Sequence, residues 1–128
     1  WVHKTAKVFA SAYLAGPAII GAETEVRQCA FVRGNALVGK GCVIDKSIIA
    51  ENTKIGEGAI LGIGSEEPNK LKPAVYSFGL VTIGENSVIP DHVQIGKNTA
   101  ISGITNKEDY PDGVLGSGET LIKAGEIA

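Results

Sequence analysis

Large aliphatic residues recur every six positions along the first half of the chain. A small residue stands four positions after nearly every one of them, and the exception in the series is Ile48. A helix requires apolar spacings of three and four and a simple strand requires alternation, so a period of six fits neither. The pattern predicts a repeat of short strands joined by tight corners, each strand with one large aliphatic pointing inward. The aliphatic positions are Val2, Val8, Leu14, Ile20, Val26, Val32, Val38, Ile44 and, after one step of five, Ile49, Ile55 and Leu61.

Three six-residue units make one coil of eighteen, and each coil is stable only against its neighbours. The period holds over residues 2–62, stops over 63–79 and returns over 80–106, where Ile83, Ile89, Ile95 and Ile101 are the aliphatic positions. The interruption has two prolines and clustered charges, so we expect it to project as a loop. The tail, 107–128, has a strong turn signal, and we expect it to cap the last coil and its open strand edge. The whole chain, 1–128, is expected to be one domain.

Side chains that directly precede an inward aliphatic should point outward from the flat faces. Eighteen residues separate Tyr13 from Phe31 and Ile19 from Leu37, so each pair should stack in neighbouring coils. Two apolar outer faces favour contact with a partner chain or domain. Ordinary surface aromatics on a small protein are the alternative interpretation.

The third face should be solvated, because its expected outward residues are charged. Arg27 and Asp45 lie one coil apart on it and are expected to form a surface ion pair, worth about 0–1 kcal/mol. The set consists of Lys7, Glu25, Arg27 and Asp45.

Composition narrows the classes of function. A net charge of −2 gives no attraction to nucleic acid or to a membrane surface. Neither a membrane-length apolar run nor a signal-peptide pattern is present. We expect Cys42 in the core and Cys29 exposed at a corner, without a disulfide between them, and a cytoplasmic location. The chain begins at Trp1 and not at Met, which indicates a fragment of a larger protein.

The repeat resembles the left-handed parallel β-helix of the hexapeptide family. That family's unit is an aliphatic residue, then Gly, Ala, Asp or Glu, two free positions, a small residue and one more. The resemblance implies an all-β fold, a left-handed parallel β-helix with eighteen residues per triangular coil. Parallel crossovers are right-handed in nearly all sheets, so the handedness is implied by the resemblance alone. The units that match at the first two positions are Val38-Gly39, Ile44-Asp45, Ile55-Gly56 and Leu61-Gly62.

Two parts of the chain resemble different branches of this family. From about residue 44 onward, phrases such as IIAENTKIGEGAILGIGSEEPNKLKP look like the C-terminal β-helix domain of bacterial glucose-1-phosphate adenylyltransferase-like sugar nucleotidyltransferases. Residues 1 to about 40 look more like the UDP-N-acetylglucosamine pyrophosphorylase-like branch. The chain is either natural or a recombinant chimera of two related β-helices, joined near Val38–Gly41.

In those families a separate N-terminal domain carries the chemistry, with a Gly-rich phosphate loop, a Lys and metal-binding carboxylates. None of these motifs occurs here, and the glycines sit at expected β-corners. We therefore predict a non-catalytic module without catalytic, cofactor or metal residues. The resemblance implies a role in oligomerisation, in docking to the missing catalytic domain and in effector binding.

Two other hypotheses remain open, an acyltransferase and an engineered scaffold, and a third, a zinc hydrolase, is excluded. A hexapeptide acyltransferase using acyl-CoA would need a His as general base, and the two candidates are His3 and His92, each more simply a surface His. A zinc hydrolase would need three His ligands and fails on count. An engineered scaffold would have no native ligand. Weak candidates for an anionic effector, with solvated charge as the alternative, are Arg27, Arg33, Lys70 and Lys72.

Overall fold

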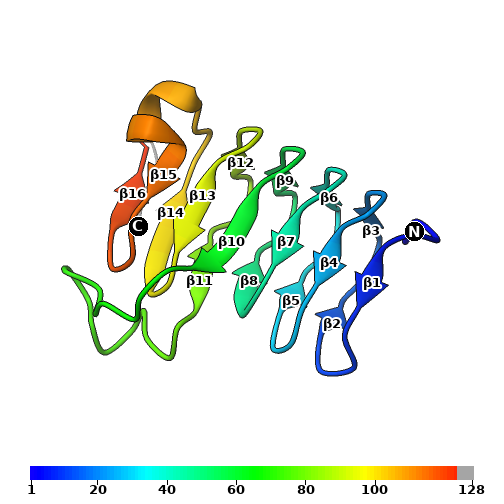
Figure 1. The fold of residues 1–128 in the computed structure, drawn as a ribbon, viewed down its shortest axis with the longest axis horizontal. Helices are drawn as coiled ribbons and strands as arrows, with labels where there is room; N and C mark the ends of the chain where they lie inside the picture. The colour runs from blue at the N-terminus through cyan, green and yellow to red at the C-terminus, as the bar shows by residue number, and fades with distance from the viewer. Residues whose placement is uncertain (124–128) are drawn as a thin grey trace.

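The structure, a computed structural model, describes residues 1–123 and forms a β-solenoid of three parallel sheets around one core (Figure 1). Sheet A has the order β12-β9-β6-β3, sheet B the order β1-β4-β7-β10-β13-β15, and sheet C the order β16-β14-β11-β8-β5-β2. The chain visits sheets B, C and A in turn, so each group of three successive strands makes one coil. The predicted all-β hexapeptide-repeat fold is therefore confirmed.

The strands are short because each ends at a corner after two to four residues. Their bounds are β1 Lys7–Val8, β2 Tyr13–Leu14, β3 Ala18–Ile20, β4 Glu25–Val26, β5 Phe31–Val32, β6 Ala36–Val38, β7 Val43–Ile44, β8 Ser47–Ile49, β9 Lys54–Ile55, β10 Ile60–Ile63, β11 Val81–Ile83, β12 Val88–Ile89, β13 Gln94–Gly96, β14 Thr99–Ser102, β15 Val114–Leu115 and β16 Thr120–Ile122.

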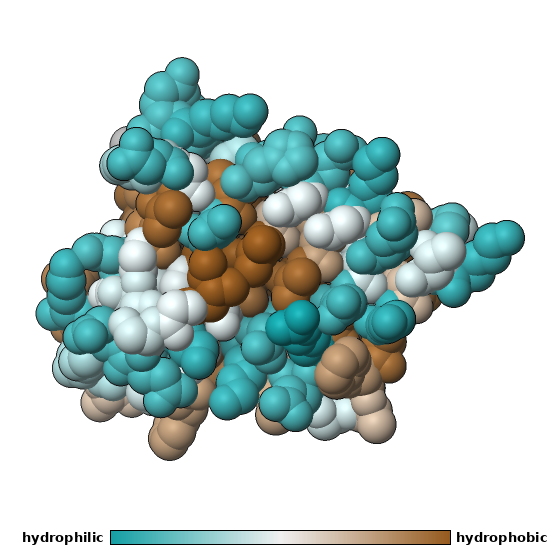
Figure 2. All heavy atoms as spheres, viewed as in Figure 1, coloured by the Kyte–Doolittle hydropathy of each residue, from teal (hydrophilic) through white to brown (hydrophobic). Residues whose placement is uncertain are grey.

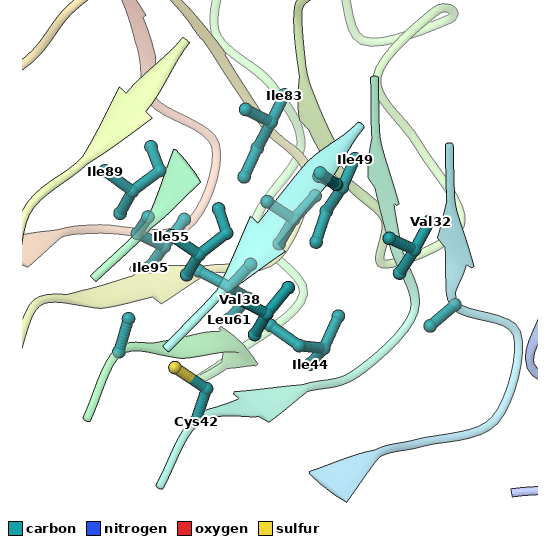
Figure 3. Close-up of a cluster of buried hydrophobic side chains, with 14 of the residues drawn as sticks. Val32, Val38, Cys42, Ile44, Ile49, Ile55, Leu61, Ile83, Ile89 and Ile95 are labelled. Atoms are coloured by element: carbon teal, nitrogen blue, oxygen red, sulfur yellow. The ribbon is translucent and has the colours of Figure 1, made fainter. Parts of the chain in front are cut away.

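The aliphatic series fills the interior as one column (Figure 3). Ile44, Leu61 and Ile95 are all 0% exposed and stack directly, because β7, β10 and β13 pair in that register. Burying one such side chain is worth about 1.5–3 kcal/mol. The small residues also point inward. Where the small residue is Thr, its hydroxyl can donate to a backbone carbonyl at a corner: Thr24 Oγ1 donates to Gly39 O at 2.8 Å, and Thr99 Oγ1 donates to Gly96 O at 2.8 Å. A polar residue can therefore replace Ala there without an unsatisfied group.

Ile48 does not occupy a small inward position. The residue that does is Ser47, which is fully buried, while Ile48 pairs with Phe31 and points outward. The five-residue step is absorbed just before Ser47, where Lys46 has a φ of +46° and the Ser47 hydroxyl donates to Asp45 O at 2.9 Å.

The tail adds a further partial coil. β15 pairs with β13 and β16 pairs with β14, which covers those strand edges. After β14 the chain touches sheet A only through a single parallel bridge between Ile104 and Val88 of β12, and two 3₁₀ turns, η1 Lys107–Asp109 and η2 Pro111–Gly113, then lead to β15. The part of the expected cap at 124–128 lies outside the described residues. At the opposite end no described residue forms a coil beyond the first one, and its inward residues Val2 and Val8 are 41% and 39% exposed.

Tyr110, between the two 3₁₀ turns, closes the core at the C-terminal end of the solenoid. It is 2% exposed, and its hydroxyl lies 2.8 Å from Thr105 Oγ1, which itself donates to Val88 O. Burial raises the pKa of Tyr110 to about 12.

Tyr110 is expected to make the fold less stable in alkali. An unfolded tyrosine has a pKa of about 10. Because the folded pKa is raised, the protonated phenol stabilises the fold fully below pH ~10, and about 2–3 kcal/mol is lost as the pH rises to the folded pKa. Tyr110→Phe should remove this loss. Urea unfolding of both proteins across this pH range measures it, and equal pH dependence in the two would contradict it.

Candidate functional site

The outer face of sheet C carries a row of large apolar side chains over its first three coils. Tyr13 and Phe31 are paired in register, with ring centroids 5.0 Å apart, and are 58% and 37% exposed. Ile48 follows Phe31 in the row. The predicted stacking is confirmed. Beside the row a shallow apolar hollow is lined by Cys29, Phe31, Arg33, Ile48 and Leu80.

The outer face of sheet A has a second, shorter row. Ile19 pairs with Leu37, as predicted, and the two are 47% and 40% exposed. Trp1, which is 70% exposed, lines a hollow together with both side chains. The next position in the row is Lys54, which interrupts the apolar surface before the row continues with Val88 and with Ile104, which is 69% exposed.

The prediction of a uniformly charged third face is wrong. Sheet B begins with the pair Lys7 and Glu25, but its outward row continues with Val43 and Ile60, both half-buried. In the view of Figure 2, hydrophobic side chains gather near the middle of the molecule, where β7 and β10 lie in Figure 1.

The predicted pair between Arg27 and Asp45 is also wrong. Arg27 Nε donates instead to Glu25 Oε1 at 3.0 Å, because both residues point outward from one strand and its corner. Asp45 Oδ1 is buried and has no hydrogen-bond partner in the structure.

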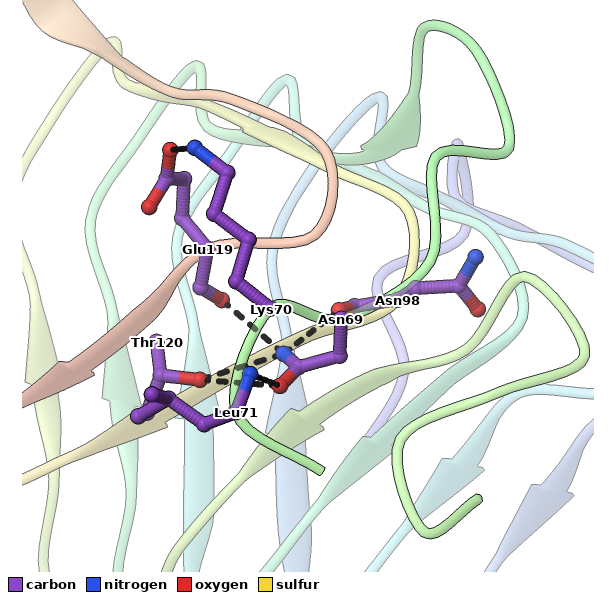
Figure 4. Close-up of polar contacts among 6 residues, drawn as sticks. All are labelled: Asn69, Lys70, Leu71, Asn98, Glu119 and Thr120. Atoms are coloured by element: carbon purple, nitrogen blue, oxygen red, sulfur yellow. Dashed lines mark hydrogen bonds and ion pairs between the residues drawn. The ribbon is translucent and has the colours of Figure 1, made fainter. Parts of the chain in front are cut away.

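The β10–β11 loop, residues 64–80, is held against the last two coils by Asn69 (Figure 4). Asn69 is 2% exposed; its Nδ2 donates to Asn98 O at 2.9 Å and to Thr120 Oγ1 at 3.1 Å. Its Oδ1 accepts from the backbone N–H groups of Leu71 and Lys72, at 3.0 and 2.9 Å. One buried amide therefore fixes both the turn of the loop and its place on the solenoid.

Asn98 is a second anchor of this loop. Its Oδ1 accepts from Gly79 N–H at 2.8 Å and its Nδ2 donates to Glu67 O at 3.0 Å. Gly118 completes the contact, because a Cβ there would lie 2.4 Å from Pro68 O. Neither anchor could be recognised from the sequence, where Asn69 and Asn98 have the character of ordinary turn residues.

The loop lies on the outer face of sheet C. Thr120, which contacts Asn69, pairs with Ala100, and Ala100 points outward because its neighbours Thr99 and Ile101 point inward. Ala100 is nevertheless only 5% exposed. The loop's own apolar side chains remain outside, with Leu71 70%, Val75 65% and Phe78 87% exposed.

The four basic candidates are not brought together into one anion site. Arg27 pairs with Glu25, and Lys70 pairs with Glu119 across the loop contact. Arg33 lies beside the sheet C hollow. Its Nη2 is 3.5 Å from Glu51 Oε1, and its Cζ is 6.0 Å from the centroid of the Phe31 ring. Lys72 is exposed on the loop.

Within residues 1–123 neither histidine is hydrogen-bonded to a carboxylate. His3 Nδ1 lies 2.9 Å from Thr5 Oγ1. The His3 ring also makes a T-shaped contact with the Trp1 ring, with the two ring centroids 5.5 Å apart. His92 is exposed at a corner against Gly58, in a hollow that Glu23, Lys40 and Glu57 also line. Among residues 1–123, no group of three or more His, Cys, Asp or Glu side chains could hold a metal ion.

Both cysteines are free thiols, Cys29 exposed and Cys42 buried. Burial raises the pKa of Cys42, whose Sγ donates to Gly56 O at 3.0 Å, so this thiol is held neutral in the core. Within the described residues no helix is long and apolar enough to span a membrane.

Curated relatives are glucose-1-phosphate adenylyltransferases. That of Acetivibrio thermocellus is 38% identical over 95 residues, 74% of this chain and 22% of the relative. That of Lachnospira eligens is 57% identical over 65 residues, 51% of this chain and 15% of the relative. The chain thus spans about a fifth or less of the length of these relatives. A chimeric origin stays a prediction.

Among solved structures, PerB of Caulobacter crescentus in complex with CoA and GDP-perosamine matches with a TM-score of 0.66 at 15% identity, covering 96% of this chain and 50% of PerB. At that identity the match supports the fold alone. No family model matches the sequence. The identities to these relatives confirm the sequence resemblance to bacterial glucose-1-phosphate adenylyltransferases, and the matched segment is a small part of each relative.

Proposed function

We propose that this chain is a non-catalytic β-helix module of a cytoplasmic sugar-1-phosphate nucleotidyltransferase. In that role it joins copies of the protein and docks against a catalytic domain. The exposed apolar rows on sheets C and A support this proposal most, because a small domain rarely leaves stacked aromatic and aliphatic side chains in water without a partner. Among the described residues neither histidine is hydrogen-bonded to a carboxylate, although Glu23 and Glu57 line the hollow of His92, and this arrangement agrees with a structural role.

Light scattering over a concentration series tests the assembling role. The chain has a mass of 13.3 kDa, so a dimer or larger assembly is expected to give a multiple of that value at high concentration. A monomer at every concentration up to the millimolar range would overturn the proposal.

Two assays test whether the chain lacks enzymatic activity. With ATP and glucose 1-phosphate the chain is expected to release no pyrophosphate, and with acetyl-CoA a calorimetric titration is expected to give no heat of binding. Binding of acetyl-CoA, abolished by His92→Ala or His3→Ala, would instead support the acyltransferase hypothesis.

A further inference from the structure

We propose that the open part of the outer face of sheet C is a docking site for the β10–β11 loop of a second copy of this chain. The two copies then associate about a two-fold axis. The proposal rests on the assembling role proposed above, and it specifies the surface and the partner segment. The open part consists of Tyr13, Phe31 and Ile48, with the adjacent hollow.

The contact between this loop and sheet C already exists within one copy. Asn69 seats the loop on the outward-pointing Thr120, and Ala100, the next outward residue of sheet C, is almost fully buried. The outward row of sheet C therefore has two different halves. In the last coils the loop contacts this face at Thr120 and Ala100 is buried, whereas in the first three coils Tyr13 and Phe31 are exposed and Ile48 is half-buried.

The two halves of this face are complementary to each other, so the same face of a second copy can fit against them. The outward row runs Tyr13, Phe31, Ile48, Thr82, Ala100, Thr120. A two-fold axis that lies parallel to the strands, between Ile48 and Thr82, inverts the order of the coils. It places the raised half of one copy, with the loop, opposite the bare half of the other. The same surface of both copies then forms the interface, with the first coils of each copy facing the last coils of the other, and such an isologous contact gives a closed dimer.

The apolar surface on both sides is sufficient for a specific dimer. Leu71, Val75 and Phe78 on the loop are all more than half exposed. Together with the bare row they supply roughly 600 Å² of apolar surface per copy, given the sizes of aliphatic and aromatic side chains. A standard interface buries about 800 Å² per partner, and a polar rim contributes the remainder. Arg33, which lines the hollow, and its ion-pair partner Glu51 are suited to that rim.

Three double variants of the whole chain test the site by analytical ultracentrifugation. Tyr13→Ser with Phe31→Ser removes the bare row, and Val75→Ser with Phe78→Ser removes the loop contact. Each is expected to raise the dimer Kd by about 30-fold or more, the effect of losing a central apolar anchor. Ile19→Ser with Leu37→Ser is the matched control on sheet A and should leave Kd within about threefold. All six side chains are exposed, so circular dichroism should show that every variant folds.

Covalent capture tests the geometry directly. Cys29 lines the hollow, and Val75→Cys on the loop should form an intermolecular disulfide with it under mild oxidation, because Cα atoms about 4.4–6.8 Å apart can be bridged. Val75→Cys combined with Cys29→Ser should give no such dimer, and neither should Ile104→Cys, whose exposed side chain lies beside Val88 of sheet A.

The outcomes separate the two proposals. An assembly that survives both the sheet C and the loop variants but is lost in the sheet A variant overturns this inference and leaves the assembling role intact. A disulfide dimer that persists without Cys29 overturns it as well. A chain that is monomeric at every concentration overturns the assembling role itself.

Discussion

Leu61→Ala is expected to lower the free energy of unfolding by about 2–5 kcal/mol, the range for truncating a fully buried leucine. Leu61 is 0% exposed and stacks between Ile44 and Ile95 in the inner column. The strands on both sides are held by parallel pairing, so the column cannot collapse into the cavity. Urea unfolding measures the loss.

The location of the effect is also predictable. Because each coil contacts only its neighbours, faster hydrogen exchange should be concentrated in β7, β10 and β13. Ile104→Ala is the matched control, since that side chain is 69% exposed and its truncation should change stability by about 0.5 kcal/mol or less. A loss below 1 kcal/mol at Leu61 would mean that the inner column is not the main source of stability.

The core was predictable from the sequence because its rule is local. An inward residue every six positions fixes which side chains are buried, and the eighteen-residue count then fixes the register, as the pairs Tyr13–Phe31 and Ile19–Leu37 demonstrate. The same count gave the wrong residue, Ile48, for the small inward position after Ile44. One unit there has five residues instead of six, and the count alone does not say at which corner the unit is shortened. The hydroxyl of Ser47 was the available signal, since most buried small positions elsewhere carry Ala, Ser or Thr, although Cys42, Val81 and Val93 are exceptions.

The errors on the third face have a related origin. Arg27 and Asp45 are eighteen residues apart, but Glu25 lies on the same face only two residues from Arg27 and reaches it first. Alternation along the strand predicts that neighbour, whereas the count between coils does not. The outward Val43 and Ile60 were likewise visible as residues preceding an inward aliphatic.

The loop contact could not be predicted in the same way. Asn69 and Asn98 are ordinary turn residues in sequence, and nothing local distinguishes a solvated amide from one buried between two segments. Their partners lie far away along the chain: Thr120 is 51 residues from Asn69. Only the folded arrangement of the last coils brings those groups together, and the docking surface inferred for sheet C depends on it.

Asn69→Ala is expected to release this loop and to lower the free energy of unfolding by about 2–3 kcal/mol. The substitution leaves the buried carbonyl of Asn98 and the N–H groups of Leu71 and Lys72 without their partner, and each unsatisfied buried group costs about 1–3 kcal/mol unless water reaches it. Hydrogen exchange should accelerate at the amides of Leu71, Lys72 and Gly79, while amides of the first three coils remain protected.

Lys72→Ala is the matched control for that substitution. Its backbone N–H still donates to Asn69, and only an exposed side chain is removed, so loop protection and stability should both stay near those of the parent chain. Because the proposed dimer requires the loop in its seated position, Asn69→Ala should also weaken self-association, and Lys72→Ala should not. Unchanged loop exchange in Asn69→Ala would show that the Asn98 and Gly118 contacts alone hold the loop, and the weakened association should then be absent as well.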